Sequence, residues 1–93
     1  MNKCVVQLFG LPHEVTELQK VEVGLKDRAS LGDVIAALKS EIPALEGPVI
    51  RVGENRLMER YAFNINGRFY ANDREFQLQE DDRIALLTLA TGG

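Results

Sequence analysis

The chain has 93 residues and a mass of 10.4 kDa, which leaves room for one domain and no linker-separated second one. A chain of this size buries only about 60% of the surface that it exposes when unfolded, so a deep catalytic cleft is not expected. Its hydrophobic fraction of 45% and charged fraction of 27% are close to the globular average and argue against a disordered or low-complexity chain.

The charge balance argues against a nucleic-acid partner. The net charge is -3, and the basic residues are scattered from Lys3 to Arg83 instead of forming a patch. No apolar run approaches the length of about 18 residues that a membrane span needs, and the first residues lack the apolar core of a signal peptide. We therefore expect a soluble protein that stays in the cytoplasm, with no membrane partner.

The first 25 residues predict two neighbouring strands. An apolar, β-branched run at Cys4–Phe9 has the composition of a strand, and Gly10 and Pro12 end it. Apolar and polar residues then alternate over 18–25, which is typical of a half-buried strand. Two such strands in succession imply a hairpin.

A helix with a recognisable start follows. Ser30 can cap it, and Asp33, three residues later, can complete a shortened capping box. Apolar residues then recur at helical spacing as far as Ile42, and Pro43 stops the helix. We expect this single helix to pack through one apolar stripe.

The second half of the chain predicts a connection and a hairpin. The segment 45–60 contains several turn residues, and we expect a surface connection with a short strand at Val49–Val52. A strand at Tyr61–Ile65 runs into the dipeptide Asn66-Gly67, which tolerates the positive φ angles of a type I′ turn, and the chain returns through 68–70.

The last apolar run, Ile84–Leu89, is nearly continuous and therefore predicts a central strand buried on both faces. This order of elements fits an α+β class in which one helix packs across one mixed sheet, with the first and last strands parallel. The arrangement is the β-grasp fold of ubiquitin. We expect one domain over residues 1–93, with an extended Gly-Gly tail at 90–93 that projects from the body.

The usual catalytic constellations are absent from the sequence, so we do not expect an enzyme. His13 has no nucleophile near it in sequence and is interpreted as an exposed loop imidazole. Cys4 has strand spacing with Val6 and Leu8 and is interpreted as a small core hydrophobe in place of a reactive thiolate. One cysteine and one histidine can form neither an internal disulfide nor a structural zinc site.

The two closing glycines, Gly92 and Gly93, are the feature that indicates a function. A carboxylate is a poor electrophile, so a new bond at Gly93 requires activation, which adenylation by ATP in a partner enzyme can supply. Glycine lacks a Cβ, so a Gly-Gly thread can enter a channel too narrow for other residues. It also leaves the acyl carbon open to an attacking sulfur or amine.

Three sequence features carry a resemblance to a known family: I-N-G-R-F at 65–69, an acidic turn before D-R-I-A-L-L, and the ending T-G-G. Together they resemble the small subunit of molybdopterin synthase (MoaD) and, more distantly, the thiamine-pathway carrier ThiS. The resemblance implies that a MoeB- or ThiF-like enzyme of the ubiquitin-activating type adenylates Gly93 and that a thiocarboxylate then forms there. Gly92 would be the slim residue behind it, and Thr91 would belong to the same tail.

The resemblance also implies partners and a docking surface. The thiocarboxylate would donate sulfur in molybdopterin synthesis for the molybdenum or tungsten cofactor, where a MoaE-like large subunit performs the catalysis. The family docks partners through apolar side chains on the exposed sheet face near the tail, and Leu87 stands where it often has Phe. We therefore expect Leu87, Leu89 and Phe69 to be docking residues, with ordinary core packing as the alternative.

The sequence leaves other functions open. Sulfur transfer in thiamine synthesis or another pathway requires the same tail. So does a ubiquitin-like modifier, in which a lysine amine of a target attacks Gly93 in place of sulfur. In a third alternative the chain is an interaction domain whose glycines are incidental. MoaD tails usually carry prolines where this chain has Thr88-Leu89-Ala90, which leaves open a looser tail or a longer last strand.

Overall fold

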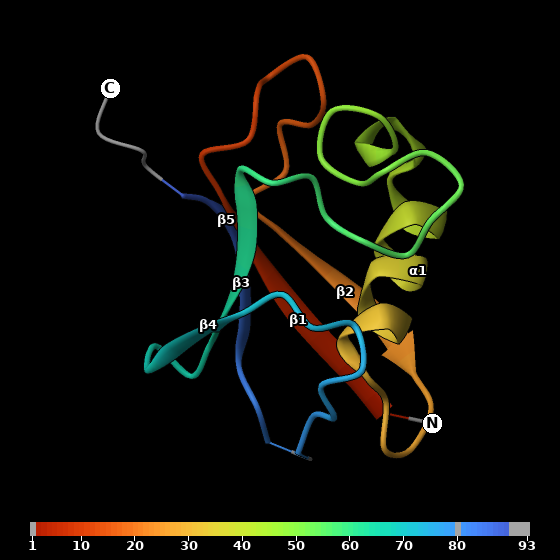
Figure 1. The fold of residues 1–93 in the computed structure, drawn as a ribbon, viewed down its shortest axis with the longest axis vertical. Coiled ribbons are helices and arrows are strands. Elements are labelled where there is room, and N and C mark those ends of the chain that lie inside the picture. The colour runs from red at the N-terminus through yellow and green to blue at the C-terminus, as the bar shows by residue number, and fades with distance from the viewer. Residues whose placement is uncertain (1, 80, 90–93) are drawn as a thin grey trace.

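The computed structural model of the chain describes residues 2–79 and 81–89. These residues contain five strands, one α-helix and one short 3₁₀ helix, joined by loops (Figure 1). The predicted tail at 90–93 lies outside the described residues. The elements in chain order are β1 (Asn2–Phe9), β2 (Lys20–Leu25), α1 (Leu31–Glu41), η1 (Pro43–Leu45), β3 (Tyr61–Ile65), β4 (Phe69–Ala71) and β5 (Ile84–Thr88).

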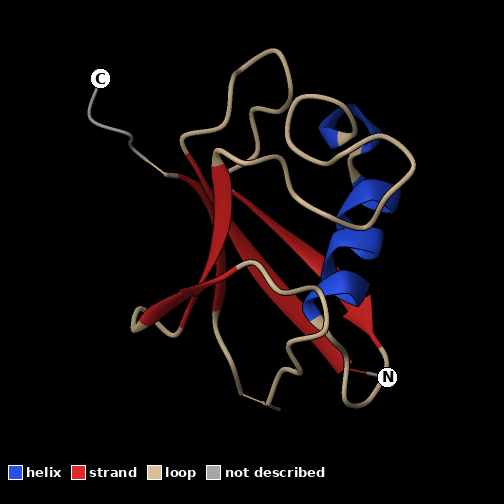
Figure 2. Ribbon diagram, viewed as in Figure 1, coloured by secondary structure: helices blue, strands red, loops and turns tan. Residues whose placement is uncertain are grey.

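The strands form one mixed sheet in the order β2-β1-β5-β3-β4. β1 pairs antiparallel with β2 and parallel with β5, while β3 pairs antiparallel with both β5 and β4. α1 lies on one side of this sheet (Figure 2). The prediction of a β-grasp fold with a central last strand parallel to the first is therefore confirmed. The predicted burial of this strand on both faces is wrong, because Ala85, Leu87 and Thr88 are only partly buried.

The core fills the space between α1 and one face of the sheet. The helix contributes the predicted apolar stripe, of which Leu31, Val34, Ile35 and Leu38 are buried. The sheet contributes alternate residues of four strands: Val6, Leu8, Val23, Leu25, Tyr61, Phe63, Ile65, Ile84 and Leu86. Full burial of a large aliphatic side chain contributes about 1.5–3 kcal/mol, so this apolar layer is the main source of stability.

A capping box starts α1, as predicted. The Asp33 N–H donates to Ser30 Oγ at 3.3 Å, and the Ser30 N–H donates to Asp33 Oδ2 at 2.9 Å. The backbone N–H of Ser30 is the main cause that lowers the pKa of Asp33, and the Ser30 hydroxyl and Lys26 lower it further. The ionised carboxylate therefore stabilises the helix start.

The segment between β4 and β5 is tied to the same end of α1. The N–H groups of Leu31 and Gly32 donate to the carbonyls of Phe76 and Arg74, each at 2.9 Å. A Cβ on Gly32 would lie 3.1 Å from Arg74 O, so glycine permits this close approach. The N–H groups that a helix leaves unpaired at its start are thus satisfied by the chain itself.

The prediction of a strand at Val49–Val52 is wrong. Ile50 makes only isolated bridges to Glu46 and Leu57, and the Arg51 N–H donates to Arg56 O at 2.8 Å. The segment therefore bonds to itself instead of joining the sheet. The apolar side chains of Val49 and Ile50 are instead fully buried in the core.

The Asn66-Gly67 hairpin turn is confirmed, since the φ angles of these residues are 58° and 69°. Asn66 also holds the loop before β5: its Nδ2 donates to Asp82 Oδ1 at 2.9 Å, and its Oδ1 accepts the Arg83 N–H at 2.8 Å. One side chain thus fixes both the turn and the start of the central strand.

Ser30→Ala should lower the free energy of unfolding by about 1 kcal/mol in urea denaturation, because the Asp33 N–H loses its acceptor.

The contribution of the Asp33 carboxylate to the free energy of unfolding should depend on pH. Its pKa is below 3.8 in the folded protein, so its stabilising contribution is present above pH 3.8 and is lost as the pH falls through the lower, folded value.

Asp33→Asn is the control for this pH dependence. The free energies of unfolding of wild type and Asp33→Asn should differ at neutral pH and converge in acid. A difference that stays constant over the whole range would mean that the Asp33 charge does not support the cap.

Candidate functional site

The end of the central strand is held from both sides. The Leu89 N–H donates to Arg60 O at 2.7 Å, which continues the β3–β5 ladder one residue past β5. On the other side, Thr88 Oγ1 donates to Gly10 O at 3.0 Å and ties β5 to the end of β1. Thr88 and Leu89, the last described residues of the chain, are therefore held at the carboxyl end of the central strand.

The pairing register separates the residues of β5 between two faces. Leu86 is fully buried beneath α1. Leu87 lies on the opposite, open face, where it pairs with Phe9 on β1 and Ala62 on β3. Phe9 is 52% exposed, Leu87 is half-buried and Ala62 is buried. We call Phe9, Leu87 and Ala62 the apolar row.

A more polar row crosses the open face next to the apolar row. Gln7, Ala85, Asn64 and Tyr70 pair across four strands, and Tyr70 is 60% exposed. Further along β1, the Lys3 and Glu22 side chains form an exposed ion pair at 3.8 Å. The apolar row next to the end of β5, with a more polar row beside it, has the composition of a docking surface.

The predicted docking residues do not share one face. Leu87 lies in the apolar row, and strand alternation puts Leu89 on the same side. Phe69 pairs with Ile65 and therefore lies on the helix side, where its ring contacts Phe76 edge to face at a centroid distance of 5.7 Å. A single partner surface that covers Leu87 would not cover Phe69, and the docking role of each remains a prediction.

Sequence reasoning missed Phe9. Its signal was present, because β1 carries apolar residues on both faces: Cys4, Val6 and Leu8 toward the helix, and Phe9 on the other side. The remaining predicted site residues, Thr91, Gly92 and Gly93, lie outside the described residues.

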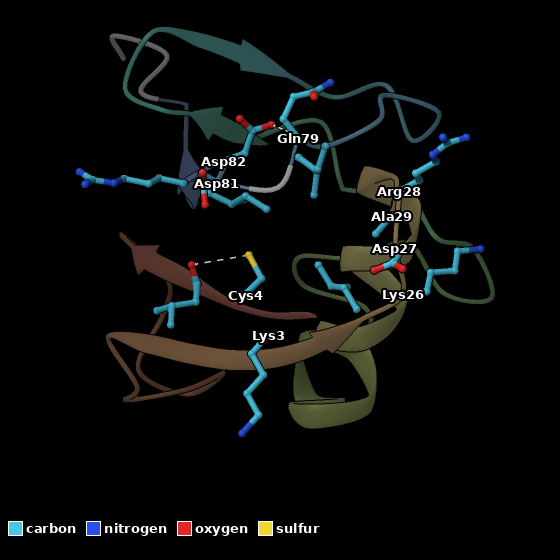
Figure 3. A pocket seen from close by; sticks show the side chains of 14 residues that line it. Lys3, Cys4, Lys26, Asp27, Arg28, Ala29, Gln79, Asp81 and Asp82 are labelled. Carbon is cyan, nitrogen blue, oxygen red and sulfur yellow. Dashed lines mark hydrogen bonds between the residues drawn. The ribbon is translucent and has the colours of Figure 1, made fainter. Parts of the chain in front are cut away.

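A pocket of about 580 Å³ lies near the start of β5, at the opposite end of that strand from Leu89. Figure 3 shows Cys4 pointing from β1 toward Asp81 and Asp82 across this pocket. Burial raises the pKa of the Cys4 thiol, and the charge of Asp82 raises it further. The thiol therefore stays protonated at neutral pH and packs against the core as a small hydrophobe.

Other candidate groups do not gather into a site. His13 is exposed in the connection between β1 and β2, as expected. Among residues 2–79 and 81–89, no three His, Cys, Asp or Glu side chains are placed to hold a metal ion together. Of the helices that the structure describes, none is long and apolar enough to cross a membrane.

The fold, with its open sheet face beside the end of the central strand, defines a small ubiquitin-like protein of the sulfur-carrier or modifier class. The family model described as the ThiS family matches residues 6–93. The chain belongs to the ThiS family, and the resemblance drawn from its sequence is confirmed. No curated protein matches the sequence.

Solved structures agree with this assignment. The crystal structure of SAMP1 from Haloferax volcanii is 27% identical, with a TM-score of 0.80 over 99% of this chain and 100% of that one. A putative molybdopterin converting factor subunit 1 from Pyrococcus furiosus is 17% identical, with a TM-score of 0.69 over 97% and 100%. A chain of the Amycolatopsis orientalis BexX/CysO complex is 15% identical, with a TM-score of 0.68 over 97% and 99%. The last two share the fold.

Cys4 should react slowly with iodoacetamide. Because its pKa lies above the ordinary value of 9.0, the folded protein holds less thiolate at neutral pH than an unfolded chain does. Mass spectrometry should show slower alkylation in the folded state than in urea, with a rate that rises with pH. Equal rates in the two states at neutral pH would show that the thiol is neither shielded nor shifted.

Proposed function

We propose that this chain is a sulfur carrier for cofactor biosynthesis and that the carboxyl group of Gly93 accepts the sulfur. The observation that carries the proposal is the position of the strand that leads to Gly93. β5 is the central strand, its end is held at Thr88 and Leu89, and the apolar row lies beside that end. The family model also matches the chain as far as Gly93.

The proposed chemistry takes place in a partner enzyme. A carboxylate oxygen of Gly93 attacks the α-phosphorus of ATP, and pyrophosphate leaves. Hydrosulfide then attacks the acyl carbon, AMP leaves and a proton is released, and the product is a thiocarboxylate that can pass its sulfur to an acceptor. The carrier contributes no catalytic group and binds no cofactor in this scheme, because the partner supplies the nucleotide site. Gly92 and Thr91 would enter the partner behind the reacting group.

The length of the tail limits where a partner can bind. Residues 90–93 reach at most about 14 Å from Leu89 even when fully extended. The partner's reaction centre must therefore lie within that distance of the end of β5 when the two proteins dock. The apolar row is the surface next to this point, so we assign docking to Phe9 and Leu87, with Leu89 at its edge.

The proposed partners follow from the same assignment. A MoeB- or ThiF-like adenylyltransferase would activate Gly93. The sulfur acceptor we favour is a MoaE-like large subunit of molybdopterin synthase, with this chain as the non-catalytic small subunit. The likeness in fold to a protein described as a putative molybdopterin converting factor subunit supports this choice. A thiamine-type pathway would use the same tail and the same docking surface.

A second candidate function is protein modification. It is favoured by the 27% identity, over almost the whole chain, to a structure titled SAMP1, and by a further neighbour titled small archaeal modifier protein 1. In this case a lysine amine attacks the activated Gly93 acyl carbon, AMP leaves and an amide forms. Intact mass separates the two functions: sulfur transfer exchanges one oxygen for sulfur on the free chain, whereas conjugation produces larger species on a denaturing gel.

Gly92→Phe, or one alanine appended after Gly93, should abolish thiocarboxylate formation. The first blocks a narrow channel and the second displaces the reacting carboxylate. The measurement is the intact mass of the carrier after incubation with ATP, a sulfide source and an adenylating enzyme of the ubiquitin-activating type.

Ala44→Phe is the matched control for added bulk, since Ala44 is exposed in η1. This variant should be thiocarboxylated like wild type, and all three variants should unfold at the same temperature as wild type. A Gly92→Phe chain that still gains sulfur would contradict the proposed threading of the tail.

Phe9→Ser should weaken binding to the adenylating enzyme by about tenfold, because a central apolar anchor contributes about 1–2 kcal/mol. The dissociation constant, measured by calorimetry, checks this. Leu87→Ser should have the same direction of effect, since it lies next to Phe9 in the apolar row.

Phe69→Ser is the matched comparison, because Phe69 is also about half exposed but lies on the helix side of the sheet. Docking through the open face requires an unchanged dissociation constant for Phe69→Ser, whereas the docking role predicted for Phe69 from the sequence requires weaker binding. The opposite result, with weaker binding for Phe69→Ser and none for Phe9→Ser, would move the docking surface to the helix side.

A further inference from the structure

The contact between Thr88 and Gly10 joins residues that are far apart in sequence. Thr88 is the last residue of β5, and Gly10 is the first residue after β1. Backbone pairing between these strands ends at Phe9 and Leu87, so the Thr88 hydroxyl extends the connection by one residue through its bond to Gly10 O. On the other side, the Leu89 N–H bonds to Arg60 O.

Gly10 fits this contact in two ways. Its φ angle of 70° is in the left-handed region that favours glycine. A Cβ at Gly10 would lie 3.2 Å from Thr88 Oγ1 and 3.6 Å from Thr88 Cβ, so a side chain would crowd the hydroxyl that makes the bond. The absence of a side chain at Gly10 therefore leaves room for the Thr88 hydroxyl at the end of β5.

The bond is exposed, which limits its contribution to stability. Its location suggests a different role. It acts at the last residue that the sheet holds through both β1 and β3, directly before Leu89. Movement at this point would change the direction in which the chain leaves the sheet at Leu89.

We propose that Thr88 and Gly10 are positioning residues for acyl activation: their hydrogen bond sets the direction of the chain at Leu89, so that the chain approaches a docked partner from one direction. This inference rests on the proposed function of Gly93. Alignment of a reacting group lowers the barrier of the chemical step. Docking through Phe9 and Leu87 is a separate interaction, so loss of the bond lowers kcat by a larger factor than it raises KM for the carrier.

Thr88→Val tests the role, because it keeps the shape of the side chain and removes the hydroxyl. The kcat of thiocarboxylate formation should fall about threefold to tenfold, the factor that corresponds to one neutral hydrogen bond. Exchange of the Leu89 amide hydrogen should accelerate by a similar factor, and that of Leu86 should not change. Thr88→Ser keeps the hydroxyl and should restore both values to those of wild type.

Thr16→Val is the matched control, since it removes a hydroxyl that accepts the Leu18 N–H in the β1–β2 connection and takes no part in the bonds of β5. It should leave kcat, KM and Leu89 exchange unchanged. Equal kcat values for wild type and Thr88→Val, or a kcat for Thr88→Ser as low as that for Thr88→Val, would overturn the positioning role. So would a rise in KM with no fall in kcat.

The amide exchange separates two kinds of failure. If wild type gains no sulfur, the proposed function fails and the positioning role fails with it, while accelerated Leu89 exchange in Thr88→Val would still establish the hydroxyl as the support of this strand end. If wild type gains sulfur and Thr88→Val neither slows nor exchanges faster at Leu89, only the positioning inference is wrong.

Discussion

Parallel pairing of β1 with β5 requires a long crossover, because two parallel neighbours cannot be joined by a tight turn. β2, α1 and the β3–β4 hairpin supply that crossover, and α1 covers one face of the sheet as a result. The same pairing brings the carboxyl ends of the first and last strands to one edge. Phe9 and Gly10 thus meet Leu87 and Thr88, and the proposed site exists only because of this pairing.

β5 serves the core and the surface at once. Leu86 is buried beneath the helix, while Leu87, one residue later, faces away from it. Since adjacent strand residues point to opposite faces, stability and docking are assigned to different side chains of one strand. The Lys3–Glu22 and Lys26–Asp33 ion pairs lie at the surface, and pairs of this kind contribute little. The apolar core therefore carries the fold and leaves the open face available to a partner.

The two ends of β5 differ in their chemistry. At its start, Asn66 and Asp82 fix the entering loop, and Cys4 is held as a protonated thiol beside a pocket. At its end, backbone and hydroxyl bonds hold Thr88 and Leu89 beside the apolar row. Cys4 therefore lies at the opposite end of β5 from Leu89, the residue that leads to the proposed reacting end. This separation suits a protein that presents a reacting group to another enzyme.

The local elements and the fold class were predictable from the sequence, because their signals lie within a few residues of each other. The Ser30–Asp33 capping box, the Asn66-Gly67 turn and the apolar run of β5 are of this kind. Tertiary structure alone decided which face each apolar residue occupies. Alternation defines two faces but does not say which one the helix covers, so Leu87 and Phe69 were grouped although they lie on opposite sides. Val49 and Ile50 have the composition of a strand, but tertiary packing buries them in the core outside the sheet. The Thr88–Gly10 contact joins residues far apart in the chain and therefore left no local signal in the sequence.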